Sequence, residues 1–243
     1  MLLTIGMIMK NEEKNLPLCL EGIKPILEAI PSELIIVDTG STDNSVEIAK
    51  KYTDDVRYFE WCNDFSAARN VSLEGANGEW YMFLDADEIF TDTTGIIDFF
   101  KSGEYKKYNS ATYVVRNYND YEKTEFADFI APRLTKLLPD TKFEKAIHEG
   151  LNTYGYPLKN IDNAICDHFG YVMTDDTAKN KCARNIPLLL EEHRKNPDDS
   201  MIYMQLVESY RGVDEDEALR YCDEGIELNN RIPHYSAHMI YIH

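Results

Sequence analysis

A chain of 243 residues is long enough for one α/β domain followed by a smaller module. Its formal net charge of −18 argues against nucleic-acid and anionic-membrane surfaces, because contacts to phosphates need clustered lysine and arginine. No apolar run approaches the roughly 20 residues of a membrane helix, so we expect no membrane span.

The first half of the chain alternates between two hydrophobic periods. The predicted elements are, in chain order, a strand at 2–9, a helix over about 16–30, a strand at 33–38, a helix after 41–43, a strand at 56–61, a helix over about 64–76 and a strand at 80–84. Ser41, Thr42 and Asp43 are candidate caps of the second helix. The unbroken hydrophobicity of the strands is typical of a parallel sheet buried on both faces. The pattern predicts an α/β fold with right-handed crossovers.

Two features of the whole sequence bear on the cellular compartment. The apolar start, MLLTIGMIM, has no basic leader, and it reads as a strand rather than a signal peptide. The five cysteines, at positions 19, 62, 166, 182 and 222, have neither CxxC spacing nor the density of a secreted disulfide scaffold. We expect free thiols and a cytoplasmic protein.

The second half changes character twice. Aromatic-rich strands are predicted at 111–121, 129–138, 142–151 and 164–171. We interpret them as the acceptor half, 101–173, of a domain at 1–173 whose nucleotide-binding half is 1–100. Residues 174–243 read as helical, and Ala218, Tyr221, Gly225 and Ile226 follow a pattern that resembles a tetratricopeptide helix pair. At least three such repeats are normally needed, and one to two fit here, so we expect a truncated array or one capped by the first domain.

Acidic residues follow two of the predicted parallel strands. Asp38 ends the second strand, and Asp85 and Asp87 end the fourth. Ligands of such sheets collect outside the carboxyl ends of the strands, so these acids should converge on one edge. Alternate residues of an extended chain point the same way, and carboxylates with phosphate oxygens are the ligands that Mg²⁺ prefers. By itself the Asp-x-Asp pattern also fits a solvated turn or a cap of the following helix.

Four segments together carry a family resemblance. MIMKNEEKNL, LIIVDTGSTDNSVEIAKKY, WCNDFSAARNVSLEGANGEWYMFLDADE and KAIHEGL occur in the order and at about the spacings of family 2 glycosyltransferases with the GT-A fold. The resemblance covers roughly residues 1–170. The sequence most resembles the bacterial branch of this family in which tetratricopeptide repeats follow the catalytic domain. This branch includes peptide S-glycosyltransferases.

The resemblance implies an inverting, metal-dependent hexosyl transfer from a UDP-sugar to a peptide, a protein or a cell-surface glycan, with Mn²⁺ or Mg²⁺ as cofactor. It places Ile8, Lys10 and Glu12 in the loop around the nucleoside, although Lys10 stands where Tyr is more common. It assigns Asp38 to the uracil ring and Arg69 to the nucleotide and its phosphates. A turn-forming Asp38 and a surface Arg69 are the structural alternatives.

The same resemblance assigns the reaction centre. Asp85, followed by Ala86, would contact the ribose or the metal shell, and Asp87 would bind the metal. Glu149 matches the general base, with His148 as the competing base and a structural pair as the third reading. His168 matches a histidine that reaches the metal, although a core histidine is equally compatible with its aromatic neighbours.

Basic residues mark a departure from the family pattern. Arg133 lies where relatives carry an Arg-Leu-Phe-Arg-like run, but Thr135 and Lys136 replace its second half. Three more basic residues are candidates to contact the diphosphate: Lys179, Lys181 and Arg184. A solvated start of a helix would explain them equally well.

Two other functions fit part of the sequence. A metal-dependent nucleotidyltransferase also uses a sheet and carboxylates, but it usually has a glycine-rich loop after the first strand, and no glycine follows Gly6 there. A catalytically silent sugar-nucleotide-binding or scaffold protein would keep these acids as relics. We expect the helical region to contact a protein acceptor, a protein partner or a second copy.

Overall fold

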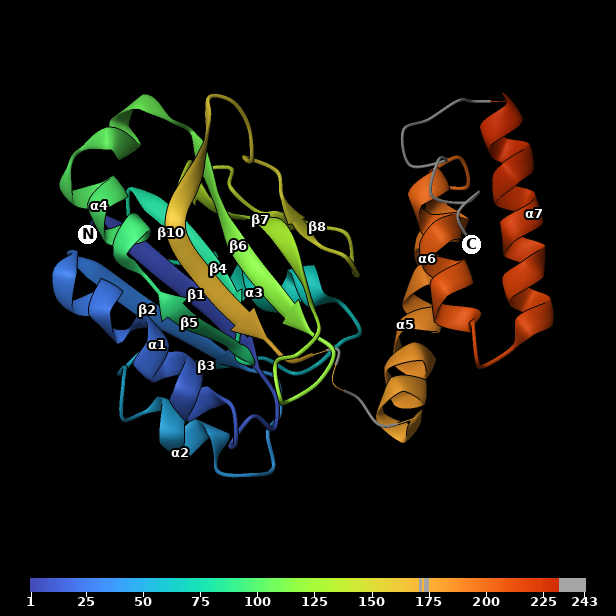
Figure 1. Cartoon of the computed structure of the whole chain (residues 1–243), viewed down its shortest axis with the longest axis horizontal. Helices are drawn as coiled ribbons and strands as arrows, with labels where there is room; N and C mark the ends of the chain where they lie inside the picture. Colours follow the sequence, from blue (N-terminus) through green and yellow to red (C-terminus); the bar gives the residue numbers. More distant parts are fainter. Residues whose placement is uncertain (171, 173–174, 232–243) are drawn as a thin grey trace. The chain divides into compact units, whose positions relative to one another are not determined.

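The computed structural model describes residues 1–170, 172 and 175–231, with the side chains of 175–178 and 231 excepted. These residues form two units. The first is Met1–Glu144 with Glu149–Val172, and the second is Lys145–His148 with the chain from Met173 onward. Figure 1 shows strands and helices in the first unit and helices in the second. No helix in the described part of the chain is both long and apolar enough to cross a membrane.

The first unit is built on one mixed sheet. Its described residues form eight strands in the order β3-β2-β1-β4-β7-β6-β10-β5. The strands are β1 Leu3–Met9, β2 Ser32–Asp38, β3 Val56–Tyr58, β4 Trp80–Asp85, β5 Glu88–Asp92, β6 Ser110–Tyr118, β7 Phe126–Lys136 and β10 Leu158–His168. Strands β1 to β4 are mutually parallel, as the sequence predicts, whereas β7 is antiparallel to both of its neighbours. The α/β fold class is therefore confirmed.

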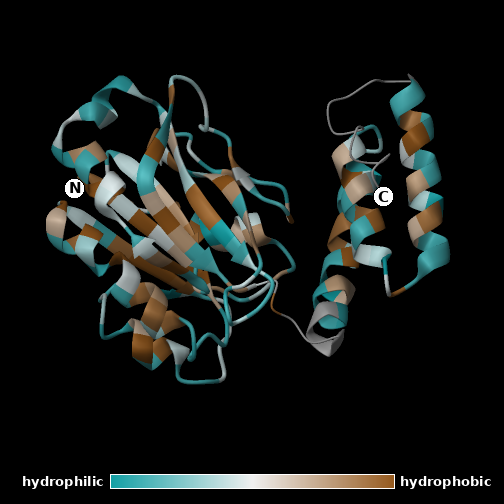
Figure 2. Ribbon diagram, in the orientation of Figure 1, coloured by the Kyte–Doolittle hydropathy of each residue, from teal (hydrophilic) through white to brown (hydrophobic). Residues whose placement is uncertain are grey.

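Helices and a small hairpin complete this unit. They are α1 Leu16–Ala29, α2 Ser45–Ala49, α3 Phe65–Leu73, α4 Thr94–Lys101, the 3-10 helix Glu104–Lys107, and the short strands β8 Phe143–Glu144 and β9 Gly150–Leu151. Apolar side chains line β1 and the inner face of α1, where Leu3, Ile5, Leu20 and Ile23 are fully buried. Figure 2 shows the most hydrophobic residues concentrated on the central strands and the inner faces of the helices. Each such side chain stabilises the fold by about 1.5–3 kcal/mol.

Several predicted boundaries differ from the structure. The second helix begins after Asn44, so none of Ser41, Thr42 and Asp43 is at its N-cap position, although Asp43 Oδ1 accepts from the N–H of Ser45. Two of these side chains also bond the loop that follows β1: the backbone N–H of Asn11 donates to Ser41 Oγ, and that of Glu13 donates to Asp43 Oδ2. The loops at the carboxyl ends of β1 and β2 are thereby joined. The helix predicted over 64–76 ends at Leu73, and the strand predicted at 56–61 ends at Tyr58.

The second unit contains three described helices, α5 Asp175–Lys195, α6 Ser200–Tyr210 and α7 Glu215–Arg231. Asp199 caps α6 by accepting from the N–H of Met201. Ala218 and Tyr221 of α7 are buried, and Tyr221 stacks on Tyr210 of α6. The predicted helix pair is confirmed, while its tetratricopeptide identity stays a prediction. Residues 235–243, YSAHMIYIH, lie outside the described residues.

Candidate active site

The carboxyl ends of three adjacent strands bring the predicted acids to one edge. β1 lies between β2 and β4, with Met9 opposite Asp38 and Ile8 opposite Asp85. Two strand spacings of about 4.8 Å place the ends of β2 and β4 about 10 Å apart. β4 ends at Asp85, Ala86 and Asp87 form a turn, and β5 begins at Glu88. The sequence did not predict β5, which turns the chain back directly after the Asp-x-Asp motif.

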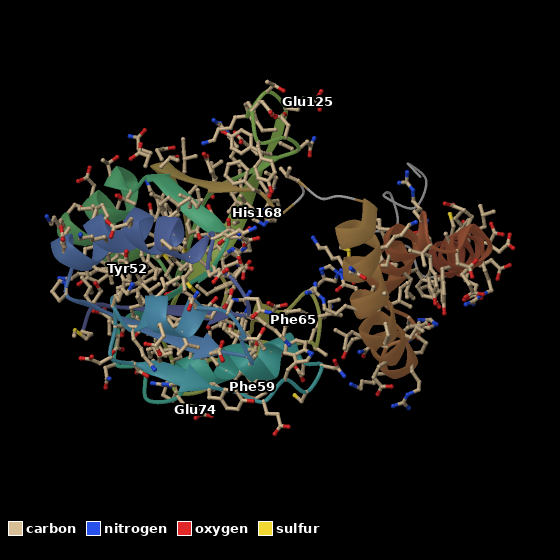
Figure 3. The ribbon with its side chains drawn as sticks, turned by 90° about the horizontal axis from the view of Figure 1, so that it is seen from below. Tyr52, Phe59, Phe65, Glu74, Glu125 and His168 are labelled. Carbon is tan, nitrogen blue, oxygen red and sulfur yellow. The ribbon has the colours of Figure 1, made fainter. Side chains whose placement is uncertain are left out.

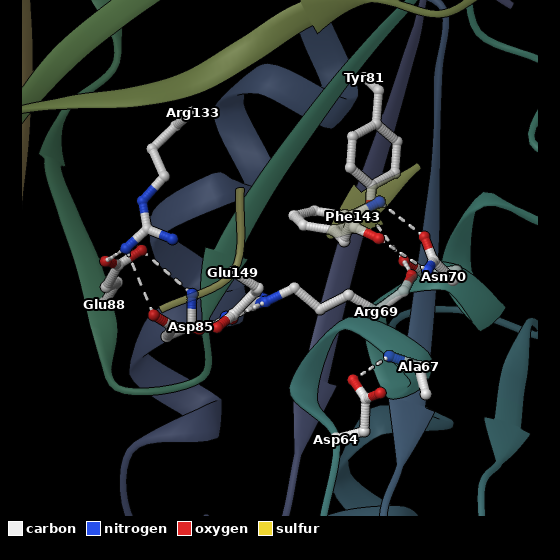
Figure 4. Close-up of polar contacts among 11 residues, drawn as sticks. Asp64, Ala67, Arg69, Asn70, Tyr81, Asp85, Glu88, Arg133, Phe143 and Glu149 are labelled. Atoms are coloured by element: carbon white, nitrogen blue, oxygen red, sulfur yellow. Dashed lines mark hydrogen bonds and ion pairs between the residues drawn. The ribbon is translucent and has the colours of Figure 1, made fainter. Parts of the chain in front are cut away.

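Arg69 joins two of these segments. Helix α3 begins at Asp64, whose carboxylate accepts from the N–H of Ala67, and the following turn directs Arg69 inward to 5% exposure. Arg69 donates from Nε to Glu149 Oε1 and from Nη2 to Asp85 Oδ1, both at 2.5 Å (Figure 4). Its Nη1 is buried and has no hydrogen-bond partner among the described residues. Its Cζ lies 5.1 Å from the centre of the Phe83 ring.

Arg133 also lies over the ring of Phe83. Its Nη2 donates to Glu88 Oε1 at 2.5 Å and to Asp85 Oδ2 at 3.3 Å, and its Cζ lies 4.6 Å from the Phe83 ring centre. Glu149, Arg69, Asp85, Arg133 and Glu88 therefore form a continuous series of five alternating charges (Figure 4). We call this series the charge ladder.

The charge ladder shifts its carboxyl groups in opposite directions. Burial raises the pKa of Asp85, but the guanidinium groups of Arg69 and Arg133 lower it further, so its pKa lies well below the ordinary range. Burial raises the pKa of Glu88 to about 7, and the nearby Asp85 adds to this effect although Arg133 opposes it. Asp85 is thus held as an anion, whereas the pKa of Glu88 is shifted upward.

Asp87 and His168 form a separate pair beside the ladder. Asp87 Oδ2 lies 3.4 Å from His168 Nε2, and His168 Nδ1 donates to Asn117 Oδ1 at 2.7 Å. Burial lowers the pKa of His168, but its contact with Asp87 raises it more, so the net shift is upward. A Cβ placed on Gly170 would lie 2.3 Å from Nε2 and 3.2 Å from Oδ2, so glycine keeps the space beside this pair open.

This pair fits a divalent cation, and a place for Asp85 in the metal shell stays a prediction. Within the described residues no group of three or more acidic, histidine or cysteine side chains is arranged around one metal position. Both carboxylate oxygens of Asp85 already form ion pairs, one with Arg69 and one with Arg133. Magnesium and manganese sites in nucleotide enzymes take one or two protein ligands and complete the shell with phosphate oxygens and water, which Asp87 and His168 could accommodate.

Asp38, at the end of β2, is the most enclosed of the acids predicted at this edge. Asp38 is 5% exposed, and its carboxylate accepts from the backbone N–H groups of Gly40 and Ser41. A turn role is therefore present, and carboxylate lone pairs remain for a ligand. Burial raises the pKa of Glu12, and the negative charges of Asp87, Asp43 and Asp85 add to that shift. Glu12 is therefore close enough to the acids at this edge of the sheet to interact with them electrostatically. Ile8 is half-buried and Lys10 is exposed.

The two candidate bases differ in their surroundings. The Glu149 side chain is 12% exposed and is held by Arg69, while His148 is exposed and has a backbone φ of 54°. Asn70 supports the approach of Glu149, because its side chain accepts from the N–H of Phe143 and donates to the Phe143 carbonyl. The contacts therefore favour Glu149.

Several contributors lie outside the sequence predictions. Glu88 and Asn117 were not singled out, and Arg133 was expected on the acceptor side rather than in the charge ladder. Glu88 directly follows the Asp-x-Asp motif, and this position could have identified it from the sequence. Nothing in the local sequence distinguishes Asn117. Thr135 is fully buried, and its Oγ1 donates to the Thr153 carbonyl. Lys179, Lys181 and Arg184 lie on α5, in the second unit, and their role stays a prediction.

Comparisons with known proteins identify the family. Residues 4–152 match the model of glycosyl transferase family 2. The glycosyltransferase SunS of Bacillus subtilis is 32% identical over 231 residues, which cover 92% of this chain and 53% of SunS. A TPR repeat-containing protein of Synechococcus elongatus is 32% identical over 154 residues, 60% of this chain and 34% of that protein. The chain thus spans about half the length of SunS.

The fold has solved counterparts. Staphylococcus aureus TarS residues 1–349, solved with UDP-GlcNAc, superposes with a TM-score of 0.57 at 14% identity, covering 94% of this chain and 81% of that one. A second TarS structure gives a TM-score of 0.52 at 15% identity and covers the whole of this chain and 53% of that one. These neighbours support the GT-A-like fold. On the extent of the family match and its relation to SunS, the chain belongs to glycosyltransferase family 2.

Proposed function

We propose that the chain transfers a sugar from a UDP-sugar to an acceptor in a metal-dependent, inverting reaction. The observation that carries the proposal is the meeting of Asp38, Asp87 and Glu149 at one edge of the sheet, from segments far apart in sequence. The fold neighbour TarS binds UDP-GlcNAc, and this supports a uridine nucleotide as the donor.

The donor site is formed by the loops after β1, β2 and β4. Asp38 accepts a hydrogen bond from the uracil, Ile8 and Glu12 border the nucleoside, and Lys10 is an exposed cation in the loop after β1. Asp87 and His168 would hold Mn²⁺ or Mg²⁺, which would supply positive charge to the diphosphate. Without such charge, a chain with a net charge of −18 would repel its anionic donor.

Glu149 acts on the acceptor. One of its oxygens accepts from Arg69, and the other has no hydrogen-bond partner among the described residues. As the acceptor atom attacks the anomeric carbon, its proton passes to this second oxygen, the bond from the anomeric carbon to the phosphate oxygen breaks, and UDP leaves. A single displacement of this kind inverts the anomeric centre. Arg69 holds the base in position and balances its charge.

The acceptor is a peptide, a protein or a cell-surface glycan. Helices α5 to α7 give a second surface for a protein acceptor or partner, by analogy with architectures in which repeats follow a catalytic domain.

Calorimetry with UDP, with and without Mn²⁺, tests the proposal, with GDP and CDP as specificity controls. Metal-dependent binding of UDP is expected in the wild type and is lost in Asp87→Ala. Asp98→Ala, on an exposed position of α4, is the matched control and retains it. The absence of metal-dependent UDP binding in the wild type would remove the transferase interpretation.

A panel of UDP-sugars, followed by mass spectrometry, then separates the remaining functions. Release of UDP from one donor, and its transfer product with an acceptor, supports the glycosyltransferase. Release of pyrophosphate from UTP and a sugar phosphate would indicate a nucleotidyltransferase. Binding of UDP without hydrolysis or transfer of any donor would indicate a silent binding protein.

A further inference from the structure

One edge of β7 is open beside the charge ladder. β7 pairs with β6 along nearly its whole length, from Phe126 to Thr135, but with β4 only from Leu134 to Lys136. Within the described part of the chain, the edge from Phe126 to Pro132 has no strand on the side that faces away from β6. Seven residues of strand, about 23 Å, are therefore available for pairing.

The register shows which backbone groups point outward. The N–H of Asn119 donates to the carbonyl of Glu125, its partner in the extended β6–β7 register, so this is a hydrogen-bonded pair. Such pairs alternate along an antiparallel ladder, and the residues between them direct their N–H and C=O groups to the opposite edge. Phe126, Asp128 and Ile130 therefore present both groups outward. Pro132 has the same phase, and since it lacks an N–H it adds only an acceptor.

Side chains along this edge are exposed to an unusual degree for apolar residues. Phe126 is 50% exposed, and Phe129 and Ile130 are each 57% exposed. Every residue from Tyr121 to Ile130 is exposed, and Figure 3 shows the hairpin that carries Glu125 extending outward from the body of the unit. A long, open and apolar edge strand invites pairing with another chain, and proteins usually block such an edge.

The open edge leads directly to the site. Ala111 of β6 is opposite Leu134, and Thr112 is opposite Pro132, so Arg133 is the extra residue of a β-bulge. Bulges redirect a side chain, and this one turns Arg133 towards Asp85 and Glu88. A strand added to the edge would therefore end beside the charge ladder, which contains Glu149.

We propose that the open edge of β7 binds the acceptor as an extended polypeptide, which adds to the sheet as a further strand and brings its nucleophilic side chain to Glu149. The inference rests on the proposed function and selects among its acceptors. An extended polypeptide offers N–H and C=O groups at the strand repeat, matching the outward groups of Phe126, Asp128 and Ile130. A glycan has no such repeat of alternating donors and acceptors. The exposed Phe129 and Ile130 would contact alternate side chains of the polypeptide.

The test uses wild-type protein with UDP and Mn²⁺. The probes are pooled ten-residue peptides with a central cysteine, serine or asparagine, and maltohexaose represents a glycan. Amide hydrogen exchange should slow at least tenfold at Phe126, Asp128 and Ile130 with peptide and not with maltohexaose. In the tightest-binding peptide, ester bonds replace amides at even or at odd positions. Only one of these two sets should weaken binding, by about fivefold for each lost bond, because only alternate amides face β7.

A variant gives an independent measure. Ile130→Pro removes one outward N–H and spares the bonds to β6, as Pro132 already does at the same phase. It should raise the peptide Kd by about fivefold or more. Ile130→Val, which keeps that N–H and most of the exposed side chain, is the control and should leave the Kd nearly unchanged.

The outcomes separate the inference from the function on which it rests. If the wild type neither binds UDP nor hydrolyses a donor, the proposed function is wrong. With both intact, failure of every pooled peptide to bind at 1 mM, equal effects of the two ester sets, or binding of maltohexaose alone would overturn the inference. Protection at Phe126–Ile130 that grows with protein concentration in the absence of peptide would show an interface between copies, and would also overturn it.

Discussion

Arg69 Nε donates to Glu149 Oε1 across 80 positions of sequence, at a distance of 2.5 Å. The same guanidinium donates to Asp85, so one buried cation connects the proposed base to the strand that carries the Asp-x-Asp motif. The planar fork of arginine suits this arrangement, since it offers several donors in fixed directions. Preorganisation of Glu149 is therefore built into the folded protein.

Removal of that cation should destabilise the first unit. Arg69→Met leaves Asp85 and Glu149 as nearby anions without their shared partner, and the expected loss is about 3 kcal/mol or more in the free energy of unfolding. Arg69→Lys keeps the charge but cannot reproduce both bonds, so its loss should be smaller. Urea unfolding measures both. Lys142→Met, which removes an exposed pair with Glu144, is the control and should lose less than about 1 kcal/mol. Equal losses at positions 69 and 142 would contradict the role given to Arg69.

Glu149→Gln should separate binding from chemistry. Glutamine still accepts from Arg69 but cannot take a proton from the acceptor, so UDP binding and thermal stability should persist while the transfer rate falls at least a hundredfold. Calorimetry and product analysis measure the two effects. Glu144→Gln, at an exposed position five residues earlier, is the matched control and should keep the wild-type rate. If Glu149→Gln keeps nearly the full rate of sugar transfer, Glu149 is not the general base. His148 would then be the next candidate to test.

Glu33 gives a pH dependence with a defined sign. Its carboxylate accepts from Thr4 Oγ1 at 2.5 Å and from the N–H of Asn77 at 2.6 Å. Burial raises the pKa of Glu33, but these bonds lower it more, so the folded pKa lies below the ordinary value of 4.5. Its stabilisation is therefore complete above about pH 4.5 and is lost as the pH falls through the folded pKa.

The matching experiment compares Glu33→Gln with wild type between pH 3 and pH 7. The variant should be less stable by about 1 kcal/mol at pH 7, and the difference should shrink towards pH 3. Glu28→Gln, at an exposed position on α1, should show no such trend. A difference that stays constant over the whole range would show that the carboxylate charge does not contribute.

The sequence anticipated those parts of the site that lie on continuous motifs. The order of β1, β2 and β4 follows from hydrophobic runs, and the parallel arrangement then places Asp38 and Asp85 on either side of the end of β1. Glu149 and Arg69 came from short segments of the family resemblance. Each of these predictions depends on neighbours within about twenty residues.

The remaining contacts depend on strand order, which no local pattern encodes. β5 is only five residues long, and it follows a turn that resembles the approach to a helix. Its place beside β10 brings Glu88 opposite His168 in the register. Arg133 reaches Asp85 because β7 inserts next to β4 and bulges there. The long-range role of Ser41 and Asp43 was missed for a similar reason, since both bond a loop thirty residues away.

Asn117 is the least conspicuous residue of the site in the sequence, and it makes the sharpest prediction about the proposed metal. Its Oδ1 accepts from His168 Nδ1, which fixes the ring and leaves Nε2 directed at Asp87. Removing such an orienting partner typically weakens metal binding 10- to 100-fold, so Asn117→Ala should need about that much more Mn²⁺ for half-maximal UDP binding, with little change in melting temperature. Asn160→Ala, which removes a bond to Thr112 on the same pair of strands, is the matched control. An unchanged Mn²⁺ requirement in Asn117→Ala would show that this asparagine does not orient a metal ligand, because a residue with only a packing role would alter stability and leave the metal titration in place.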